Sequence, residues 1–146
     1  MKLEKVLSLF LAALCLCSIL SISASAEEIS PIEAPEIIAE YAIARNPISA
    51  LTINQNTATC TSSVDGLDCV HISATQTLQR YSGWFWSWDD VNDASWSKTV
   101  NMNSIWMSNS KSSLSSGTYR LRTDFSLTSS NGSTETITIY SNEVTI

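Results

Sequence analysis

Hydrophobic and polar residues alternate with a period of two along much of the chain from residue 41 onward. The alternation is clearest over residues 119–128, and such a period is typical of a β-strand that buries one face. No stretch in this part sustains the period of an amphipathic helix. One face of this strand carries Tyr119, Leu121, Thr123, Phe125 and Leu127, and the other carries Arg120, Arg122, Asp124 and Ser126.

Shorter stretches of the same kind predict further strands, and small polar residues mark the turns between them. Strands are expected at residues 51–54, 56–61, 70–75 (continuing towards 80), 84–88, 96–102 and 134–146. Turns are expected at Asp65-Gly66 and Ser82-Gly83, a loop at 89–93, and a serine-rich connection at 108–116. Turn signals at roughly ten-residue intervals are typical of a β-sandwich. We therefore predict that residues 41–146 form an all-β, antiparallel sandwich domain.

The last two strands can be aligned from their hydrophobic residues. A two-residue loop at Asn131-Gly132 would leave Ile137 and Ile139 without hydrophobic partners on the facing strand. A three-residue loop over 130–132 pairs Phe125 with Ile137 and Thr123 with Ile139, and it puts Gly132 at the left-handed position that such loops require. We expect the longer loop. Asn131-Gly132-Ser133 also matches a glycosylation acceptor, and we interpret it as a turn.

The N-terminal part has the features of a signal peptide, which we expect to be helical. Residues 1–26 contain the basic Lys2 and Lys5, an apolar stretch over 6–22, and small residues at 24–26 that suit signal peptidase. We expect cleavage before Glu27, with an uncleaved signal anchor as the alternative. Residues 27–40 are rich in glutamate and hold Pro31 and Pro35, so we expect a flexible acidic lead-in. A short helix over 35–45 is the alternative.

Export and charge together limit the partners. Removal of residues 1–26 takes away two lysines and one glutamate, which leaves 6 Lys/Arg against 13 Asp/Glu and a net charge of −7. An acidic domain is repelled by nucleic-acid phosphates and by anionic lipid headgroups. We therefore expect a secreted, extracellular or cell-wall-associated protein that binds neither nucleic acid nor, once the leader is cleaved, membrane.

Two cysteines remain after the leader is removed. Cys60 and Cys69 are nine residues apart on either side of a predicted turn, and an oxidising compartment favours a disulfide between such a pair. Structural zinc needs four ligands, and the chain has a single histidine to add to these two. We predict a disulfide.

A short motif before the strand at 119–128 resembles a known structural feature. Leu114-x-x-Gly117-x-Tyr119 resembles the tyrosine corner of immunoglobulin-like sandwiches, although Leu121 stands where their second inter-sheet cysteine would be. The wider pattern resembles a group of small, secreted, uncharacterised bacterial proteins. This resemblance implies an immunoglobulin-like β-sandwich and secretion, but no activity. The residues that carry it are 48–53, 58–60, 77–80, 95–99, 116–121 and 135–138.

Tryptophan is the most informative residue type for function. Trp84, Trp86 and Trp88 alternate, so on a strand their rings would emerge from one face, with Trp96 as a neighbour. Exposed rings would offer flat surfaces to sugar rings, with Asp89 and Asp90 as hydrogen-bond acceptors at the rim. The alternatives are that the rings pack in the core or drive self-association.

The other candidate chemistries lack a complete set of groups. Asp89, Asp90, Asn92 and Asp93 could supply oxygens to calcium, but their spacing lacks the EF-hand alternation and its closing glutamate, so we expect a solvated loop. His71 could act as a base, but no nucleophile can be assigned to it. We interpret Arg120, Arg122 and Asp124 as cross-strand charge pairs. We expect no catalytic residues, metal or cofactor.

The sequence thus favours a secreted or envelope-associated, non-enzymatic binding module whose ligand is a glycan or a protein. The candidate contact residues are Trp84, Trp86, Trp88, Trp96, Asp89 and Asp90. One alternative is a structural or adhesion protein of the envelope that self-associates through strand edges. A small secreted toxin or hydrolase is a further alternative, and it depends on His71 and the acidic loop.

Overall fold

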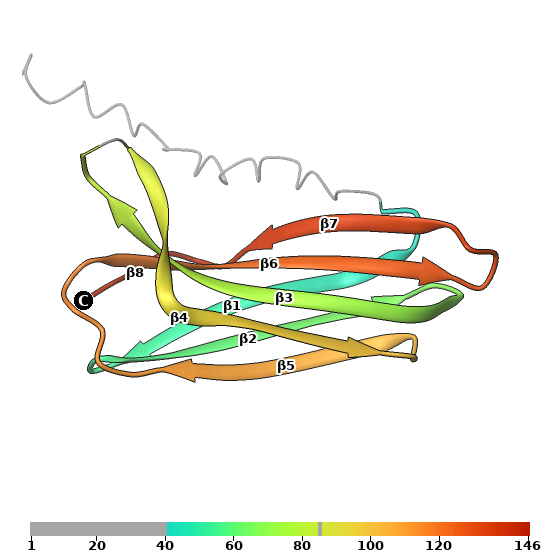
Figure 1. Cartoon of the computed structure of the whole chain (residues 1–146), viewed down its shortest axis with the longest axis horizontal. Coiled ribbons are helices and arrows are strands. Elements are labelled where there is room, and N and C mark those ends of the chain that lie inside the picture. Colours follow the sequence, from blue (N-terminus) through green and yellow to red (C-terminus); the bar gives the residue numbers. More distant parts are fainter. Residues whose placement is uncertain (1–40, 85) are drawn as a thin grey trace, which may run out of the picture. The chain divides into compact units, whose positions relative to one another are not determined.

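The computed structural model describes residues 41–84 and 86–146, and this part of the chain is all β (Figure 1). The predicted signal peptide, the acidic lead-in and most of the alternative helix over 35–45 lie outside the described residues; the end of that helix, 41–45, is not helical. No helix of the described part is long and apolar enough to cross a membrane. The strands are β1 Ala44–Asn54, β2 Thr57–Gly66, β3 Cys69–Ser82, β4 Ser87–Val100, β5 Ser104–Lys111, β6 Thr118–Ser129, β7 Thr134–Tyr140 and β8 Val144–Thr145.

The strands form two antiparallel sheets that pack together, which confirms the predicted all-β, two-sheet architecture. One sheet has the order β1-β2-β5. The other has the order β4-β3-β6-β7, and β8 pairs with the start of β6. The chain passes from one sheet to the other between β2 and β3, between β4 and β5, and between β5 and β6 (Figure 1). The two sheets thus depend on pairings between strands that are not consecutive, β2 with β5 in one and β3 with β6 in the other.

The hydrophobic pattern of β6 and the register of the β6–β7 hairpin are confirmed. The odd-numbered residues of β6 from 119 to 129 are buried, and the even-numbered ones face outward. Phe125 pairs with Ile137 and Thr123 with Ile139. Gly132 has a φ of 87°, the left-handed conformation expected for the three-residue loop.

The tyrosine-corner motif joins three parts of the chain at the start of β6. Tyr119 is 1% exposed, and its hydroxyl donates a hydrogen bond of 2.7 Å to the carbonyl oxygen of Ser115. Leu114 is buried beside it. Gly117 exchanges backbone hydrogen bonds with Ile146, which fixes the C-terminal residue of the chain.

A chain of buried polar side chains crosses the space between the sheets. Asn109 on β5 donates to Gln76 on β3 at 2.8 Å, and Gln76 donates to Ser62 on β2 at 2.8 Å. The Ser62 and Thr123 hydroxyls lie 2.7 Å apart, and Thr123 also contacts Ser49 on β1 at 2.9 Å. No buried side-chain nitrogen or oxygen of the described residues lacks a hydrogen-bond partner.

This polar chain lies among two hydrophobic clusters. One contains Ile72, Phe125 and Leu127, and the other contains Leu78, Tyr119 and Leu121. Gln76, Ser62 and Thr123 are each 0% exposed and are not members of either cluster. A buried polar network of this kind is stable only when its members satisfy one another, so it ties five strands, β1, β2, β3, β5 and β6, to one relative register.

Several predicted boundaries are wrong at β4 and β5. Residues 89–93 are not a loop, because Asp89 and Asp90 pair with Arg80 and Gln79 inside β4. The irregularity lies further along, where residues 91–94 stand opposite the single residue Leu78 as a large bulge. The serine-rich connection is shorter than predicted, because residues 108–111 belong to β5 and pair with β2.

The predicted disulfide is also wrong. Cys60 and Cys69 are both free and buried. Cys60 pairs with Leu51 in the middle of β2, whereas Cys69 is the first residue of β3 and pairs with Ser129 in the other sheet. Six residues of extended β2 separate Cys60 from the turn, roughly 20 Å of strand, and a disulfide needs α-carbons within about 7 Å.

A carboxylate attaches the start of β1 to β7. Glu135 accepts hydrogen bonds from the backbone N–H groups of Ala42, Ile43 and Ala44 at 2.9, 2.8 and 2.7 Å. Burial raises the pKa of Glu135, but these three N–H groups and the charge of Arg45 lower it by more, so the pKa lies below its ordinary value. The ionised form is therefore favoured by folding.

We expect Glu135→Gln to lower the free energy of unfolding by about 1 kcal/mol at pH 7 and to have less effect at pH 3. A lowered folded-state pKa stabilises the fold above the ordinary carboxyl pKa, and this stabilisation is lost as the pH falls through the folded value. Urea unfolding at both pH values measures the difference. Glu143→Gln, at an exposed position after β7, is the control. Equal losses at the two pH values would contradict the role of the charge.

Candidate ligand-binding hairpin

The end of the β3–β4 hairpin continues beyond the neighbouring strand. Pairing between β3 and β6 ends at Arg80 and Tyr119, whereas β3 and β4 remain paired as far as Ser82 and Ser87. We call residues 81–88 the hairpin tip. It bends away from the two sheets (Figure 1). Its two strand ends therefore pair only with each other in the described part of the chain.

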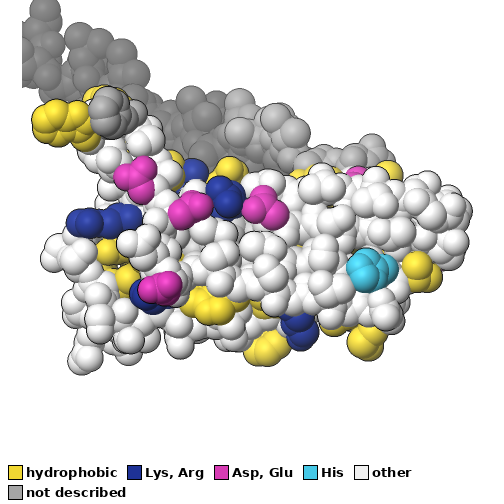
Figure 2. Space-filling model, viewed as in Figure 1, with side chains coloured by type: hydrophobic (Ala, Val, Ile, Leu, Met, Phe, Trp, Pro, Cys, Tyr) yellow, Lys and Arg dark blue, Asp and Glu magenta, His cyan; other side chains and the backbone are white. Residues whose placement is uncertain are grey.

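The tip exposes two large aromatic side chains. Trp84 is 84% exposed and Trp86 is 85% exposed, and both lie in the turn between β3 and β4. Hydrophobic side chains are visible at this projecting end (Figure 2). Trp86 has a φ of 54°, a left-handed conformation that is rare for a bulky residue. Backbone outliers of this type cluster at functional sites.

The predicted tryptophan strand is therefore wrong in its geometry. Trp84 and Trp86 belong to a turn, Trp88 is half-buried in β4, and residue 85 is outside the described part. Trp96 is half-buried and packs against both hydrophobic clusters. The structure thus keeps two of the four candidate rings in solvent, places Trp88 on the outer face of the sheet, and uses Trp96 in the core.

Trp88 is part of an aromatic and cationic cluster at the base of the tip. The guanidinium carbon of Arg120 lies 4.2 Å from the ring centroid of Trp88 and 4.2 Å from that of Tyr140. Tyr81 meets Trp88 edge-on, with 5.4 Å between ring centroids. Each cation–π contact of a partly exposed arginine stabilises by about 0.5–1 kcal/mol. These contacts fix the hairpin to β6 and β7.

Charged and amide side chains continue this outer face across three strands, β4, β3 and β6. Arg120 donates to Gln79 at 3.0 Å, and Gln79 donates to Asp90 at 2.8 Å. Arg122 contacts Asp124 at 3.1 Å and Asp90 at 3.9 Å. Lys/Arg and Asp/Glu side chains lie next to each other on this face (Figure 2). The predicted cross-strand pairing is thus present for Arg122, but with Asp90, since its contact with Asp124 lies within β6. Arg120 lies between the aromatic rings.

The opposite, inner side of the hairpin borders an open cavity of about 370 Å³, which we call the hairpin cavity. Leu114 and Tyr119, both buried, form part of its lining. Its polar lining comes from the paired strand ends, from the β4 bulge and from the connection between β5 and β6. These polar residues include Arg80, Asp89, Asp90, Asn92, Lys111 and Ser113. This volume is at the lower end of the range for small-molecule sites.

Arg80 is held in place at the edge of the hairpin cavity. Its Nη2 donates to the carbonyl oxygen of Ser116 at 2.6 Å. The side chain also lies against Gly117, where an added β-carbon would be 2.6 Å from the Arg80 Nε. The glycine of the tyrosine-corner motif thus has a second role here, because it leaves room for the arginine. The sequence motif alone did not indicate this contact.

The two acidic candidates do not act as a pair. Asp89 stands opposite Arg80 and Asp90 opposite Gln79, so their side chains leave β4 on different faces. In the part of the chain that the structure describes, no three His, Cys, Asp or Glu side chains gather as a metal site. Asn92 and Asp93 belong to the bulge, where Asp93 adopts a φ of 55°.

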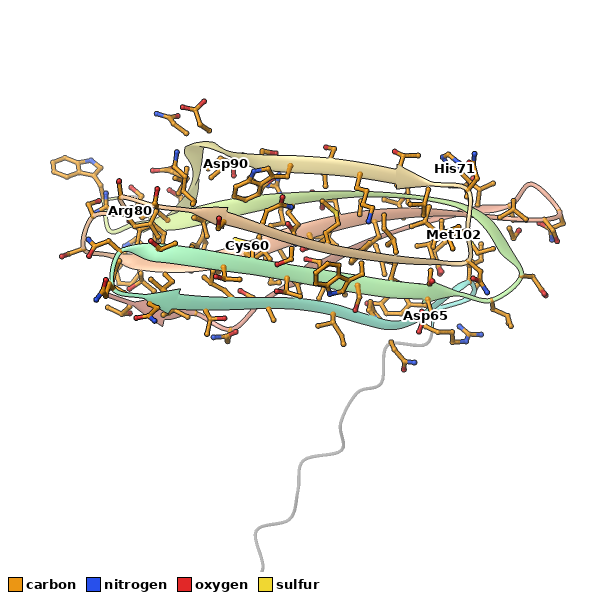
Figure 3. The ribbon with its side chains drawn as sticks, turned by 90° about the horizontal axis from the view of Figure 1, so that it is seen from below. Cys60, Asp65, His71, Arg80, Asp90 and Met102 are labelled. Carbon is orange, nitrogen blue, oxygen red and sulfur yellow. The ribbon has the colours of Figure 1, made fainter. Side chains whose placement is uncertain are left out.

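The remaining reactive side chains lie elsewhere. His71 and Asp90 are near opposite ends of the domain (Figure 3), and the register separates them by eight residues of β3, roughly 26 Å. His71 Nδ1 is 2.7 Å from Asn101 Oδ1. Burial raises the pKa of Cys60 to about 12, so this thiol stays protonated and unreactive at neutral pH.

Comparison with known proteins adds no family to this description. No protein-family model matches the chain, and no curated protein matches it. The candidate site is therefore defined by its own geometry: a projecting turn with two exposed tryptophans, an aromatic and cationic cluster on one side of its base, and the hairpin cavity on the other.

Proposed function

We propose that the chain is a secreted or cell-envelope-associated, non-enzymatic binding module that contacts its ligand through the hairpin tip. The observation that carries the proposal is the exposure of Trp84 and Trp86, at 84% and 85%, on a projecting turn. Tryptophan combines a large apolar surface with one N–H donor, and it is enriched where binding energy is concentrated. A glycan is the ligand that we favour, because flat rings offer a stacking surface to sugars.

The backbone at the tip favours a binding role over a structural one. Trp86 adds little to the core of the domain, since its side chain is in solvent, and its left-handed backbone costs about 1–2 kcal/mol. A strained, exposed and bulky residue at a turn is expensive for folding. Ligand contact gives a physical reason for such a residue.

An immunoglobulin-like fold is the finer form of the architecture that we propose. If β1 to β7 are taken as strands A, B, C, C′, E, F and G, the two sheets have the orders A-B-E and C′-C-F-G, as in sandwiches of this class. The bond from Tyr119 to the Ser115 carbonyl supports the resemblance, because it has the form of a tyrosine corner. Leu121 replaces the cysteine of strand F, in the same buried cluster as Cys60.

Self-association through strand edges is less well supported. Pro47 and a register shift interrupt β1, and the bulge at 91–94 interrupts β4. Proline and bulges on edge strands disfavour pairing with another chain. A toxin or hydrolase built on His71 and Asp90 has little support, since these side chains are roughly 26 Å apart.

Retention on insoluble glycans tests the proposal. We expect the wild-type domain to be retained on at least one of peptidoglycan, cellulose and chitin. Trp84→Ala and Trp86→Ala should each reduce this retention. Trp106→Ala is the matched control, because Trp106 is 60% exposed but lies on β5, away from the hairpin.

Two outcomes would contradict the glycan form of the proposal. One is the absence of retention on all three matrices. The other is equal retention of the wild type and both tip variants. A larger loss for Trp106→Ala than for the tip variants would move the contact surface to β5.

A further inference from the structure

The hairpin cavity contains charges of both signs that do not neutralise each other. Arg80 and Lys111 are cationic and Asp89 is anionic, whereas the carboxylate of Asp90 bonds to Gln79 and Arg122 on the outer face. Within residues 41–84 and 86–146, Arg122 is the only cation that forms ion pairs. Arg80, Lys111 and Asp89 therefore keep their charges available to a ligand.

Uncharged donors and acceptors add to this set. Ser113, Ser115 and Asn92 also line the cavity, and all three are exposed at its surface. A hydroxyl group donates one hydrogen bond and accepts others, so a ligand with many hydroxyl groups uses cationic donors and anionic acceptors together. A phosphate or a polyanion would instead be repelled by the carboxylate of Asp89, which stands opposite Arg80.

Parts of the cavity are already held in position without a ligand. Arg80 is fixed by the Ser116 carbonyl oxygen and by its seat on Gly117, and Asp89 is held opposite Arg80 by the strand pairing. Preorganised groups lose little conformational entropy on binding. The floor is apolar, formed by Leu114 beside Tyr119. An apolar floor under polar walls suits a sugar ring, which has a C–H face and hydroxyl groups at its edge.

The cavity and the tip tryptophans are close enough to serve one chain of sugars. Ser82 and Asp89 line the cavity, and the final strand pair, Ser82 with Ser87, is next to Trp86. Each residue of a strand covers about 3.3 Å. The few residues between the rim of the cavity and the two tryptophans therefore span no more than the length of a short oligosaccharide.

We propose that the hairpin cavity binds a neutral sugar unit of a polysaccharide whose neighbouring units stack on the tip tryptophans. The inference rests on the proposed binding function and adds the ligand class. Arg80 and Lys111 donate to sugar oxygens, and Asp89 accepts from sugar hydroxyl groups. Neutral sugars are favoured because Asp89 repels the carboxylate of an acidic sugar, whereas Arg80 and Lys111 repel the ammonium group of an amino sugar.

Titration calorimetry with four tetrasaccharides of similar length tests this selectivity. The probes are cellotetraose and tetra-N-acetylchitotetraose, which are neutral, tetragalacturonate, which is anionic, and the chitosan tetramer, which is cationic. We expect the wild type to bind one of the neutral probes more tightly than either charged probe. Tighter binding of a charged probe would overturn the inference.

Charge variants of the cavity sharpen the test. Asp89→Asn and Lys111→Gln should each weaken the neutral probe by about tenfold, since each removes a charged hydrogen-bonding partner. Asp89→Asn removes the carboxylate that repels an acidic sugar and should improve binding of tetragalacturonate, whereas Lys111→Gln removes a repelling cation and should improve binding of the chitosan tetramer. Asp65→Asn and Lys98→Gln, at positions outside the cavity, are the matched controls.

The result separates this inference from the proposed function. If the tip variants lose retention on the insoluble glycans while Asp89→Asn and Lys111→Gln bind like the wild type, the cavity inference falls and the tip remains the binding surface. If no soluble probe binds and the tip variants are retained like the wild type, both proposals fall.

Discussion

Replacing Gln76 with leucine is expected to lower the free energy of unfolding by about 2–3 kcal/mol. Gln76 is 0% exposed and bonds to Ser62, to the Cys60 carbonyl oxygen and to Asn109. Leucine is similar in size to glutamine, so the substitution leaves little empty space in the core. The loss of stability comes mainly from the polar groups that lose their hydrogen bonds to Gln76. Urea unfolding followed by tryptophan fluorescence measures the change.

Gln55→Leu is the control for the chemical change itself, because Gln55 is exposed in the β1–β2 turn. We expect its effect to stay within about 0.5 kcal/mol. A double-mutant cycle of Gln76→Leu with Asn109→Ala isolates the bond that joins β3 to β5. Unchanged or increased stability of Gln76→Leu would show that the polar chain does not stabilise the sandwich.

Trp86→Gly is expected to separate binding from stability. Glycine adopts the left-handed backbone without steric cost, although it is more flexible in the unfolded chain, so the free energy of unfolding should stay within about 1 kcal/mol of the wild type or rise. The affinity for the matrix that binds the wild type should fall by roughly thirtyfold. This is the loss expected for an exposed tryptophan at the centre of a contact surface.

Trp86→Ala is the informative comparison, because alanine removes the ring but keeps the strain of a β-carbon at a φ of 54°. We expect it to bind as weakly as Trp86→Gly and to be the less stable of the two. If Trp86→Gly unfolds at much lower denaturant concentration than the wild type, the ring contributes to the fold and its exposure has no separate role in binding.

The strands at the C-terminal end were the most predictable part of the fold. The alternation over residues 119–128 identifies the buried side of β6, and the hydrophobic residues of β7 together with Gly132 select one loop length. These features are local, because a strand with one buried face needs a period of two whatever lies across from it. The choice of loop needed only the adjacent strand.

The candidate site was predicted in composition but not in geometry. The aromatic run at 84–88 has the same period of two whether it forms a strand or a turn. The pairing of Ser82 with Ser87 closes the hairpin and places Trp84 and Trp86 in a turn. The four-residue bulge at 91–94 carries no local signal that distinguishes it from a loop. Asp89 and Asp90 follow the tryptophans directly in the chain, but their separation onto two faces follows from β4 being a strand.

The cysteines show why spacing alone misled the disulfide prediction. Nine residues with a turn between them suggest contact, but β2 continues for six residues after Cys60 before the chain crosses to the other sheet. The contact of Arg120 with two aromatic rings was missed for a related reason. Trp88 and Tyr140 reach Arg120 from β4 and β7, and no pattern along one strand reveals that both flank the same side chain.

By itself, the sequence determined that the part of the chain from residue 41 onward is built of strands, which face of β6 is buried, and how β6 pairs with β7. Each of these depends on the alternation of neighbouring residues. The order of strands in the two sheets, the polar chain through Gln76, the exposure of Trp84 and Trp86 and the hairpin cavity were decided only by the tertiary structure. The strand order and the polar chain depend on which strands pair across long separations in the sequence, and a period of two is the same for every partner. The exposed tryptophans and the hairpin cavity depend on where the β3–β4 hairpin closes and on how far it extends beyond β6.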